Sequence, residues 1–163
     1  MPQTIHTVVY LFHELSDKAK DKARQWWREV GTDNDWWEQV YEDAEQVGIK
    51  IIGFDIGRGQ CIDTQIHDAD NTAALILENH GEGCDTYQAA RKYWGAVKAA
   101  NDADQEDICD VLADLRSDFI GEVERCYLKS LHEQYEYEMS DENIAENIEA
   151  QGYTFTADGK RFG

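Results

Sequence analysis

Five carboxylates recur at helical spacing in the stretch "QEDICDVLADLRSDFIGEVER", residues 105–125. If this stretch is a helix, they lie three or four residues apart on one face, where neighbouring side chains meet. The row consists of Asp107, Asp110, Asp114, Asp118 and Glu122. Each like-charge pair costs roughly 0.2–0.5 kcal/mol, so the four pairs together cost roughly 1–2 kcal/mol. Such a row is suited to binding a cation or a basic protein surface.

Two further rows of carboxylates share this spacing. They are Glu38, Glu42 and Glu45 in the first third of the chain, and Glu142, Glu146 and Glu149 near its C-terminus. Carboxylates four residues apart on a helix are separated by about 6 Å of rise, which is less than the physiological Debye length of about 8 Å. The charges within each row therefore repel one another.

Two cysteines and two histidines have a spacing that a metal site could use. Cys61, His67, His80 and Cys84 follow the pattern C-x5-H-x12-H-x3-C. Structural zinc sites take their ligands in closely spaced pairs, and only His80 and Cys84 approach that arrangement. Ordinary loop residues are the favoured interpretation, and whether the four side chains come together stays open. We expect no bound metal.

The signatures of calcium binding and of catalysis are incomplete. "DADNT" at 68–72 and "DADQED" at 102–107 begin like calcium loops, but they lack the glycine at the sixth position and the glutamate at the twelfth. The sequence contains no HExxH motif, no nucleophile elbow and no phosphate-binding glycine loop. His6, His13 and Glu14 could exchange protons, but nothing distinguishes them from other exposed residues. We expect a protein that is not an enzyme and uses no cofactor.

The overall charge limits the partners that the chain can have. The chain holds 34 acidic and 15 basic residues, a net charge of −19. Residues 102–150 hold 16 acidic and 3 basic residues and so account for −13 of this charge. Direct binding to nucleic acid or to an anionic membrane is not expected, because both require a basic surface.

Length and composition predict one compact domain over residues 1–163. With 163 residues, 42% of them hydrophobic, and five Trp, the chain can bury a core, and no linker or repeat divides it. The N-terminus has no basic segment, and its apolar run is too short for a signal peptide or a membrane span. The four cysteines form no CxxC pair and are expected to be free thiols in a reducing compartment. We expect a cytoplasmic protein.

The order of the predicted elements indicates an α+β fold. β-branched and aromatic residues at 4–15 predict a first strand, and segments 49–57 and 60–67 predict a central hairpin joined at "GRG". Asp158 and Gly159 lie between short alternating segments and predict a terminal hairpin. We expect these strands to form one small antiparallel sheet, packed with five or six helices of which one is long and acidic.

Capping residues and apolar spacing place the helices. Ser16 and Asp35 are the expected N-caps of the first two helices, and Asp85 is the expected N-cap of a later one. Residues 104–138 are expected to form one long helix, or two helices broken near Gly121. A helix is slightly favoured at 71–81, and a short capped helix is expected at 140–152.

The two ends of the chain resemble a known family. The segments "LSDKAKDKARQWWRE", "DNDWWEQVYEDA" and "EYEMSDENIAENIEAQGYTFTADGKRF" are similar to small acidic proteins of phages and prophages, whose members often carry the label "antitoxin of toxin–antitoxin stability system". The resemblance does not extend to the centre of the chain, from about residue 57 to 131. It implies a phage setting, in which short cytosolic proteins act on host or rival machinery, and it transfers no binding residues.

The acidic rows and the phage setting together predict nucleic-acid mimicry. The carboxylates would occupy the basic surface of a host nuclease or CRISPR-type complex, as in an anti-restriction or anti-CRISPR inhibitor. One helical row supplies a charge per about 6 Å, against one per about 3.4 Å in a DNA strand, so a mimic needs two rows side by side. Other interpretations stay open: an antitoxin that covers a toxin, an enzyme or divalent-metal-binding protein, and rows that are solvated helix faces. The oligomeric state is also open.

Overall fold

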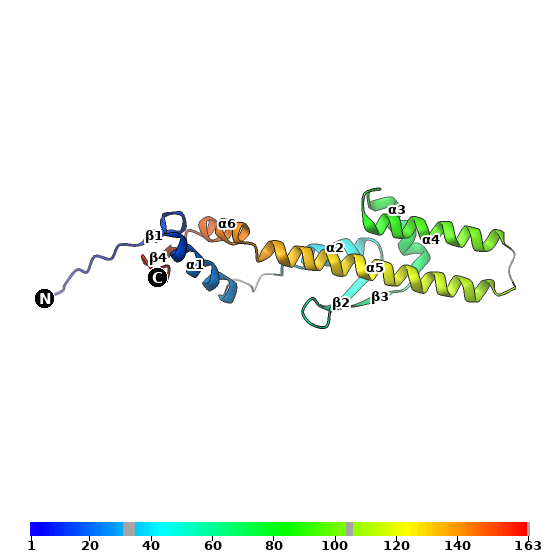
Figure 1. The fold of residues 1–163 in the computed structure, drawn as a ribbon, viewed down its shortest axis with the longest axis horizontal. Coiled ribbons are helices and arrows are strands. Elements are labelled where there is room, and N and C mark those ends of the chain that lie inside the picture. Colours follow the sequence, from blue (N-terminus) through cyan, green and yellow to red (C-terminus); the bar gives the residue numbers. More distant parts are fainter. Residues whose placement is uncertain (31–34, 104–105, 163) are drawn as a thin grey trace. The chain divides into compact units, whose positions relative to one another are not determined.

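A computed structural model describes residues 1–30, 35–103 and 106–162 (Figure 1). The chain has an α+β fold, as expected, and its residues group into two compact units. Unit 1 consists of residues 1–36 and 135–163, and unit 2 consists of residues 37–134. The single domain expected over 1–163 stays a prediction. Among the described residues, no helix combines the length and the apolar character that crossing a membrane requires.

Unit 1 combines two helices with a three-stranded antiparallel sheet in the order β1-β4-β5. Its elements are β1 (Tyr10–Leu11), the 3-10 helix η1 (Phe12–Glu14), α1 (Asp17–Val30), α6 (Asp141–Gln151), β4 (Thr154–Phe155) and β5 (Arg161–Phe162). The Ser16 hydroxyl accepts a hydrogen bond from the Ala19 N–H, which confirms the predicted cap of α1. Phe155 and Ile144 are fully buried in the core of this unit.

The C-terminal elements of unit 1 follow their local sequence signals. Ser140 caps α6 by accepting a hydrogen bond from the Asn143 N–H, and Gly152 ends the helix in the left-handed conformation with a φ of 69°. The predicted terminal hairpin is confirmed, because β4 pairs with β5 across the turn that contains Gly159. Gly159 has a φ of 89°, and a Cβ at this position would overlap the backbone oxygen of Ala19. The hairpin can therefore pack against α1 only with glycine here.

The first strand predicted over residues 4–15 is wrong in its extent. Only Tyr10–Leu11 is a strand, the 3-10 helix follows it at once, and residues 1–9 form no helix or strand. Its partner β4 is only two residues long, so there is no edge on which a longer strand could pair. Ile5 and Val8 are accordingly exposed. A β-branched composition favours a strand only where a neighbouring strand is available.

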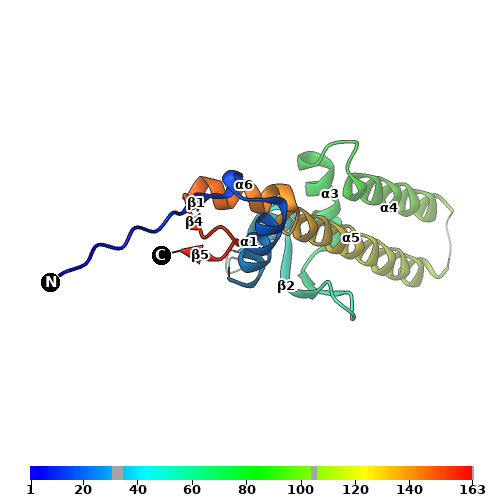
Figure 2. The same cartoon turned by 60° about the vertical axis from the view of Figure 1, so that its left-hand side comes forward.

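Unit 2 combines a hairpin with four helices. Its elements are α2 (Glu38–Gln46), β2 (Ile49–Asp55), β3 (Cys61–Ile66), α3 (Ala69–Asn79), α4 (Asp85–Asp102) and α5 (Ile108–Glu138). The end of α5, from Tyr135 onwards, belongs to unit 1. β2 and β3 pair in antiparallel fashion, which confirms the predicted central hairpin. The ribbons of α4 and α5 run side by side in both views (Figures 1 and 2).

The strands of the described residues form two sheets instead of the expected single sheet. The hairpin β2–β3 is separate from β1, β4 and β5. Ile49 and Ile51 of β2 are buried in a hydrophobic core with residues of α2, α3, α4 and α5. The terminal strands instead share a core with α1 and α6. Each unit has its own core, and each small sheet covers only the core of its own unit.

Two of the predicted N-caps lie elsewhere. α2 begins at Glu38 with Trp37 at the cap position, so Asp35 does not cap it. α4 begins at Asp85 itself, and Cys84 occupies the cap position. The Asp85 carboxylate therefore lies in the first turn of α4, where its negative charge interacts favourably with the helix dipole and stabilises the helix.

The long predicted helix forms without a break near Gly121. α5 continues from Ile108 to Glu138, and residues 104 and 105 of the predicted range lie outside the described residues. A glycine inside a helix costs about 1 kcal/mol relative to alanine. Phe119 and Val123, on either side of Gly121, are buried in the core and hold the helix through this point. The segment at 71–81 is helical in α3, as favoured.

Candidate acidic binding surface

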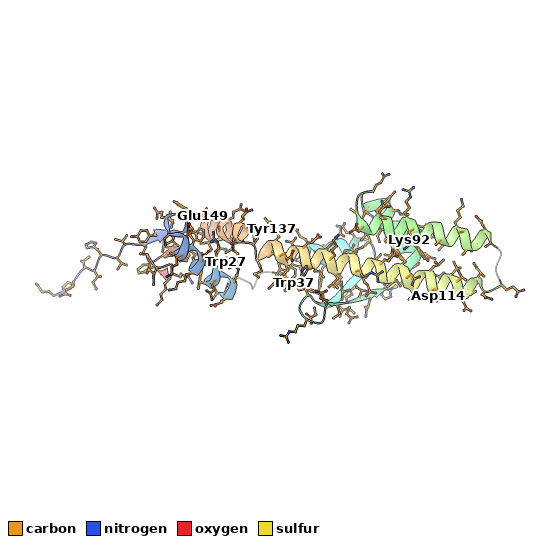
Figure 3. All side chains as sticks on the ribbon, in the orientation of Figure 1. Trp27, Trp37, Lys92, Asp114, Tyr137 and Glu149 are labelled. Atoms are coloured by element: carbon orange, nitrogen blue, oxygen red, sulfur yellow. The ribbon has the colours of Figure 1, made fainter. Side chains whose placement is uncertain are left out.

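The periodicity of α5 turns the acidic row away from the core. The buried side chains of this helix recur every four residues, at Phe119, Val123, Tyr127 and Leu131. Asp118 precedes Phe119 by one residue, and Asp114 lies one helical turn before Asp118. Adjacent residues on a helix diverge by about 100°, so the carboxylates face solvent while their neighbours pack inward. Asp114 is labelled on this exposed face in Figure 3.

Four carboxylates of the row are exposed and carry no ion pair. They are Asp107, Asp110, Asp114 and Asp118. Within the described ranges, no Lys, Arg or His side chain lies at ion-pair distance from any of them. The helical rise from the first to the last is about 16 Å. Asp107 and the first turns of α5 therefore present four negative charges without an ion pair in a short line.

Glu122, the fifth carboxylate, is neutralised from another helix. It is half-buried, and its Oε1 accepts a hydrogen bond from Lys92 Nζ of α4 at 2.7 Å. This hydrogen bond and the charge of Glu122 raise the pKa of Lys92, and the charge of Asp118 adds to the effect. No sequence pattern pointed to Lys92, because α4 and α5 meet only in the folded chain. The predicted row of five is thus a row of four exposed charges that ends in an ion pair.

The other two predicted rows are also exposed. The carboxylates on α2 are Glu38, Glu42 and Glu45, and those on α6 are Glu142, Glu146 and Glu149. Glu149 Oε1 lies 3.8 Å from His13 Nδ1 within unit 1. The α2 row lies in unit 2, as do the exposed carboxylates of the α5 row, whereas α6 belongs to unit 1. The side-by-side arrangement of two rows that mimicry needs stays a prediction.

Most of the net charge lies in unit 2. Residues 37–134 hold 21 acidic and 8 basic residues, a net charge of −13, and the rest of the chain holds 13 acidic and 7 basic residues, a net charge of −6. Basic side chains of unit 2 are engaged elsewhere: Lys129 Nζ lies 3.2 Å from Asp85 Oδ2, and Arg116 Nε lies 3.7 Å from Asp70 Oδ1. Among the described residues, Lys92 is therefore the basic side chain that interacts with the row, at Glu122 and, more weakly, at Asp118.

A further acidic contact on α5 was not apparent from the sequence. Glu124 is half-buried, and burial followed by the charge of Asp63 on β3 raises the pKa of its carboxyl. The two residues belong to different elements, so spacing along the chain could not have paired them. Glu124 lies on a face of α5 other than that of the row.

The four candidate metal ligands lie at the ends of their elements. Cys61 begins β3 and His67 follows it, while His80 ends α3 and Cys84 precedes α4. Among the described residues, no group of three or more His, Cys, Asp or Glu side chains could hold a metal ion. His80 instead contacts the Thr86 hydroxyl and the carboxylate of an aspartate on α2.

Comparisons with known proteins add no family to this description. No protein-family model matches the chain, and the searches of curated proteins and of solved structures found no match. The resemblance of the two ends to phage proteins therefore stays an expectation.

Proposed function

We propose that this chain is a phage-encoded binding protein that inhibits a nucleic-acid-handling defence system of the host by mimicking nucleic acid. The partner is a host nuclease or a CRISPR-type complex, met in the host cytosol. The observation that supports this proposal is the line of four exposed carboxylates without an ion pair, which runs from Asp107 just before α5 to Asp118 within it. These carboxylates occupy the basic surface on which the partner normally binds phosphates.

The energy of the row favours a cationic partner. In the free protein its three neighbouring pairs repel one another at a cost of roughly 0.6–1.5 kcal/mol in total. A basic surface placed against the row replaces this repulsion with attraction. Because the charges are exposed, the attraction acts mainly by steering the partners together and is weakened by salt.

The spacing of the row sets the scale of the contact. Four charges along about 16 Å give one charge per about 5.5 Å, against one per about 3.4 Å along a DNA strand. The row therefore spans the length of roughly five phosphates with four charges. A full contact therefore needs further negative charge beside the row.

Two charge-reversed variants test the proposal. In the first, Asp110, Asp114 and Asp118 are replaced by Lys; in the matched control, Glu38, Glu42 and Glu45 are replaced by Lys. Both variants change the charge of unit 2 equally, and both alter only exposed residues. Glu122 is left intact because it pairs with Lys92. Each tagged protein is incubated with bacterial lysate at low salt, and the captured proteins are identified by mass spectrometry.

We expect the native protein to capture a nucleic-acid-binding enzyme that duplex DNA or added salt releases. The α5 variant should lose this partner while its circular dichroism stays helical, and the α2 variant should retain most of the binding. Equal loss in both variants would mean that net charge, and not the row, carries the binding. Retention of the partner by the α5 variant would refute the proposal.

A further inference from the structure

A polar cluster in unit 2 joins a hydroxyl, an imidazole and a carboxylate. His80 Nδ1 lies 2.6 Å from Thr86 Oγ1, and His80 Nε2 lies 3.2 Å from Asp43 Oδ2. The His80 side chain is only 9% exposed. With the ring proton on Nε2, facing Asp43, Nδ1 is free to accept a hydrogen bond from the Thr86 hydroxyl. This order of groups is the one that activates an alcohol as a nucleophile.

Each member of the cluster is held by a separate helix. His80 is the C-terminal cap of α3, Thr86 is the second residue of α4, and Asp43 lies on α2. The Tyr127 hydroxyl on α5 donates a hydrogen bond of 2.9 Å to Asp43 Oδ2 and so orients the carboxylate. Burial, followed by the charge of Asp43, raises the pKa of Tyr127, so the phenol stays protonated as a donor. None of these residues belongs to the acidic row of α5.

The cluster borders a pocket of about 250 Å³. Asp43, His80, Thr86 and Tyr127 all line it, together with residues at the start of α4 and on α5. The first backbone N–H groups of a helix have no partner within the helix, so those at the start of α4 can stabilise an oxyanion that forms beside Thr86. The lining holds Asp43, Asp85 and Glu133 against one Lys129, which disfavours anionic substrates.

We propose that Thr86, His80 and Asp43 form an acyl-transfer site for small neutral or cationic esters. Thr86 Oγ1 bonds to the ester carbonyl carbon and passes its proton to His80 Nδ1. The bond between that carbon and the alcohol oxygen then breaks, and the alcohol leaves with the proton from His80 Nδ1. Water then attacks the acyl-Thr86 carbonyl and gives one proton to His80. The acid is released as Thr86 takes that proton back. Thr86 and His80 are the catalytic residues, and Asp43 is a positioning residue that holds the imidazole.

The Nε2 contact of His80 is at ion-pair distance but is not aligned as a hydrogen bond. Relays of this kind are often loose before substrate binds and tighten in the substrate complex. The Thr86 hydroxyl and His80 Nδ1 lie 2.6 Å apart, within hydrogen-bond reach, as proton transfer from the nucleophile to its base requires. The inference goes beyond the proposed binding function, because it assigns a reaction to residues that the acidic surface does not use.

The probe is p-nitrophenyl acetate, a small neutral ester that releases a coloured leaving group. We expect a burst of p-nitrophenolate from the native protein and an acetyl group mapped to Thr86 by tandem mass spectrometry. Thr86→Ala removes the nucleophile and should abolish the burst, because no acyl-Thr86 can form. Thr86→Ser keeps a hydroxyl and should keep the burst. Asp43→Asn should slow it while Thr86 remains the acetylated residue.

Two matched controls separate this site from general reactivity. Thr64→Ala removes another half-buried threonine of unit 2, and His67→Ala removes an exposed histidine of the same unit. Neither control should change the burst. An acetyl group on Cys84 or Cys126 in place of Thr86 would overturn the proposal. So would a burst of native size in folded Thr86→Ala. If Thr86→Ala does not fold, the adduct position in the native protein and in Thr86→Ser decides the question.

Discussion

Replacing Asp114 and Asp118 by Asn should stabilise the folded protein at low salt. Both side chains are exposed, and no ion pair within the described residues depends on either. The change removes two charges and leaves side chains of nearly the same shape. Asn and Asp also have similar helix propensities, so the backbone contribution changes little.

The expected gain follows from the neighbours of the two residues. Three like-charge pairs disappear, namely Asp110–Asp114, Asp114–Asp118 and Asp118–Glu122, and each costs roughly 0.2–0.5 kcal/mol. The sum is roughly 0.6–1.5 kcal/mol. The lost attraction between Asp118 and Lys92 offsets part of it. For a chain of this length about 1 kcal/mol corresponds to about 2–4 °C, so the melting temperature should rise by about 1–6 °C.

Thermal unfolding followed by circular dichroism at two salt concentrations measures this effect. At low salt the double variant should melt above the native protein. In about 1 M salt the Debye length falls to about 3 Å, and the difference should shrink towards zero. A variant that melts lower than the native protein would show that these carboxylates make stabilising contacts. A gain that persists at high salt would show that its cause is not charge repulsion.

Two further predictions concern other parts of the fold. Gly159→Ala should lower the free energy of unfolding, as measured in urea, by more than Gly152→Ala. An alanine at 152 has open space around its Cβ and costs only the left-handed penalty of about 1–2 kcal/mol. An alanine at 159 incurs the same penalty and also overlaps the Ala19 backbone. Burial and the hydrogen bond to Asp70 raise the pKa of Tyr93 from 10.0 to about 12. The folded state thus holds this proton more tightly, so its stabilisation is full below pH 10 and is lost as the pH rises towards 12. Tyr93→Phe should therefore flatten the fall of the melting temperature in this alkaline range.

Elements that depend on local signals could be predicted from the sequence. Ser16 and Ser140 each cap the helix that follows, and Gly152 ends α6 in the conformation that glycine favours. The turn at Gly159 lies between two strands as expected. In each case the interaction that defines the element joins residues close together in the chain. Such interactions form in the same way wherever the segment lies.

Elements that depend on distant partners could not be predicted. Residues 4–9 have the composition of a strand but have no partner beyond the two residues of β4. The central hairpin and the terminal strands were expected in one sheet, yet each packs on a core of its own unit. Hydrophobic periodicity predicts which face of a strand is buried. It does not predict which strand pairs with it or which element packs on the buried face.

The same division applies to the candidate sites. The exposed face of α5 followed from the spacing of its carboxylates, because that spacing is a property of one helix. The ion pair that neutralises Glu122 comes from Lys92, on another helix. Asp43, His80 and Thr86 come from three different helices, so no sequence motif predicts that they meet. Catalytic groups meet in space, and a sequence without a catalytic motif can still contain such a group.

The two proposals involve opposite faces of one helix and can therefore fail independently. Tyr127, which orients the relay, comes nine residues after Asp118, the last exposed carboxylate of the row. Nine residues correspond to about 13 Å of rise and to a rotation of about 180°. Among the described residues, Thr86 and the exposed carboxylates of the row share no hydrogen-bond or ion-pair partner, and substitutions without a shared partner usually have additive effects. Loss of partner binding in the charge-reversed α5 variant should leave ester cleavage unchanged, and loss of cleavage in Thr86→Ala should leave partner binding unchanged. If either substitution abolished both properties, it would act by unfolding unit 2 and would support neither proposal.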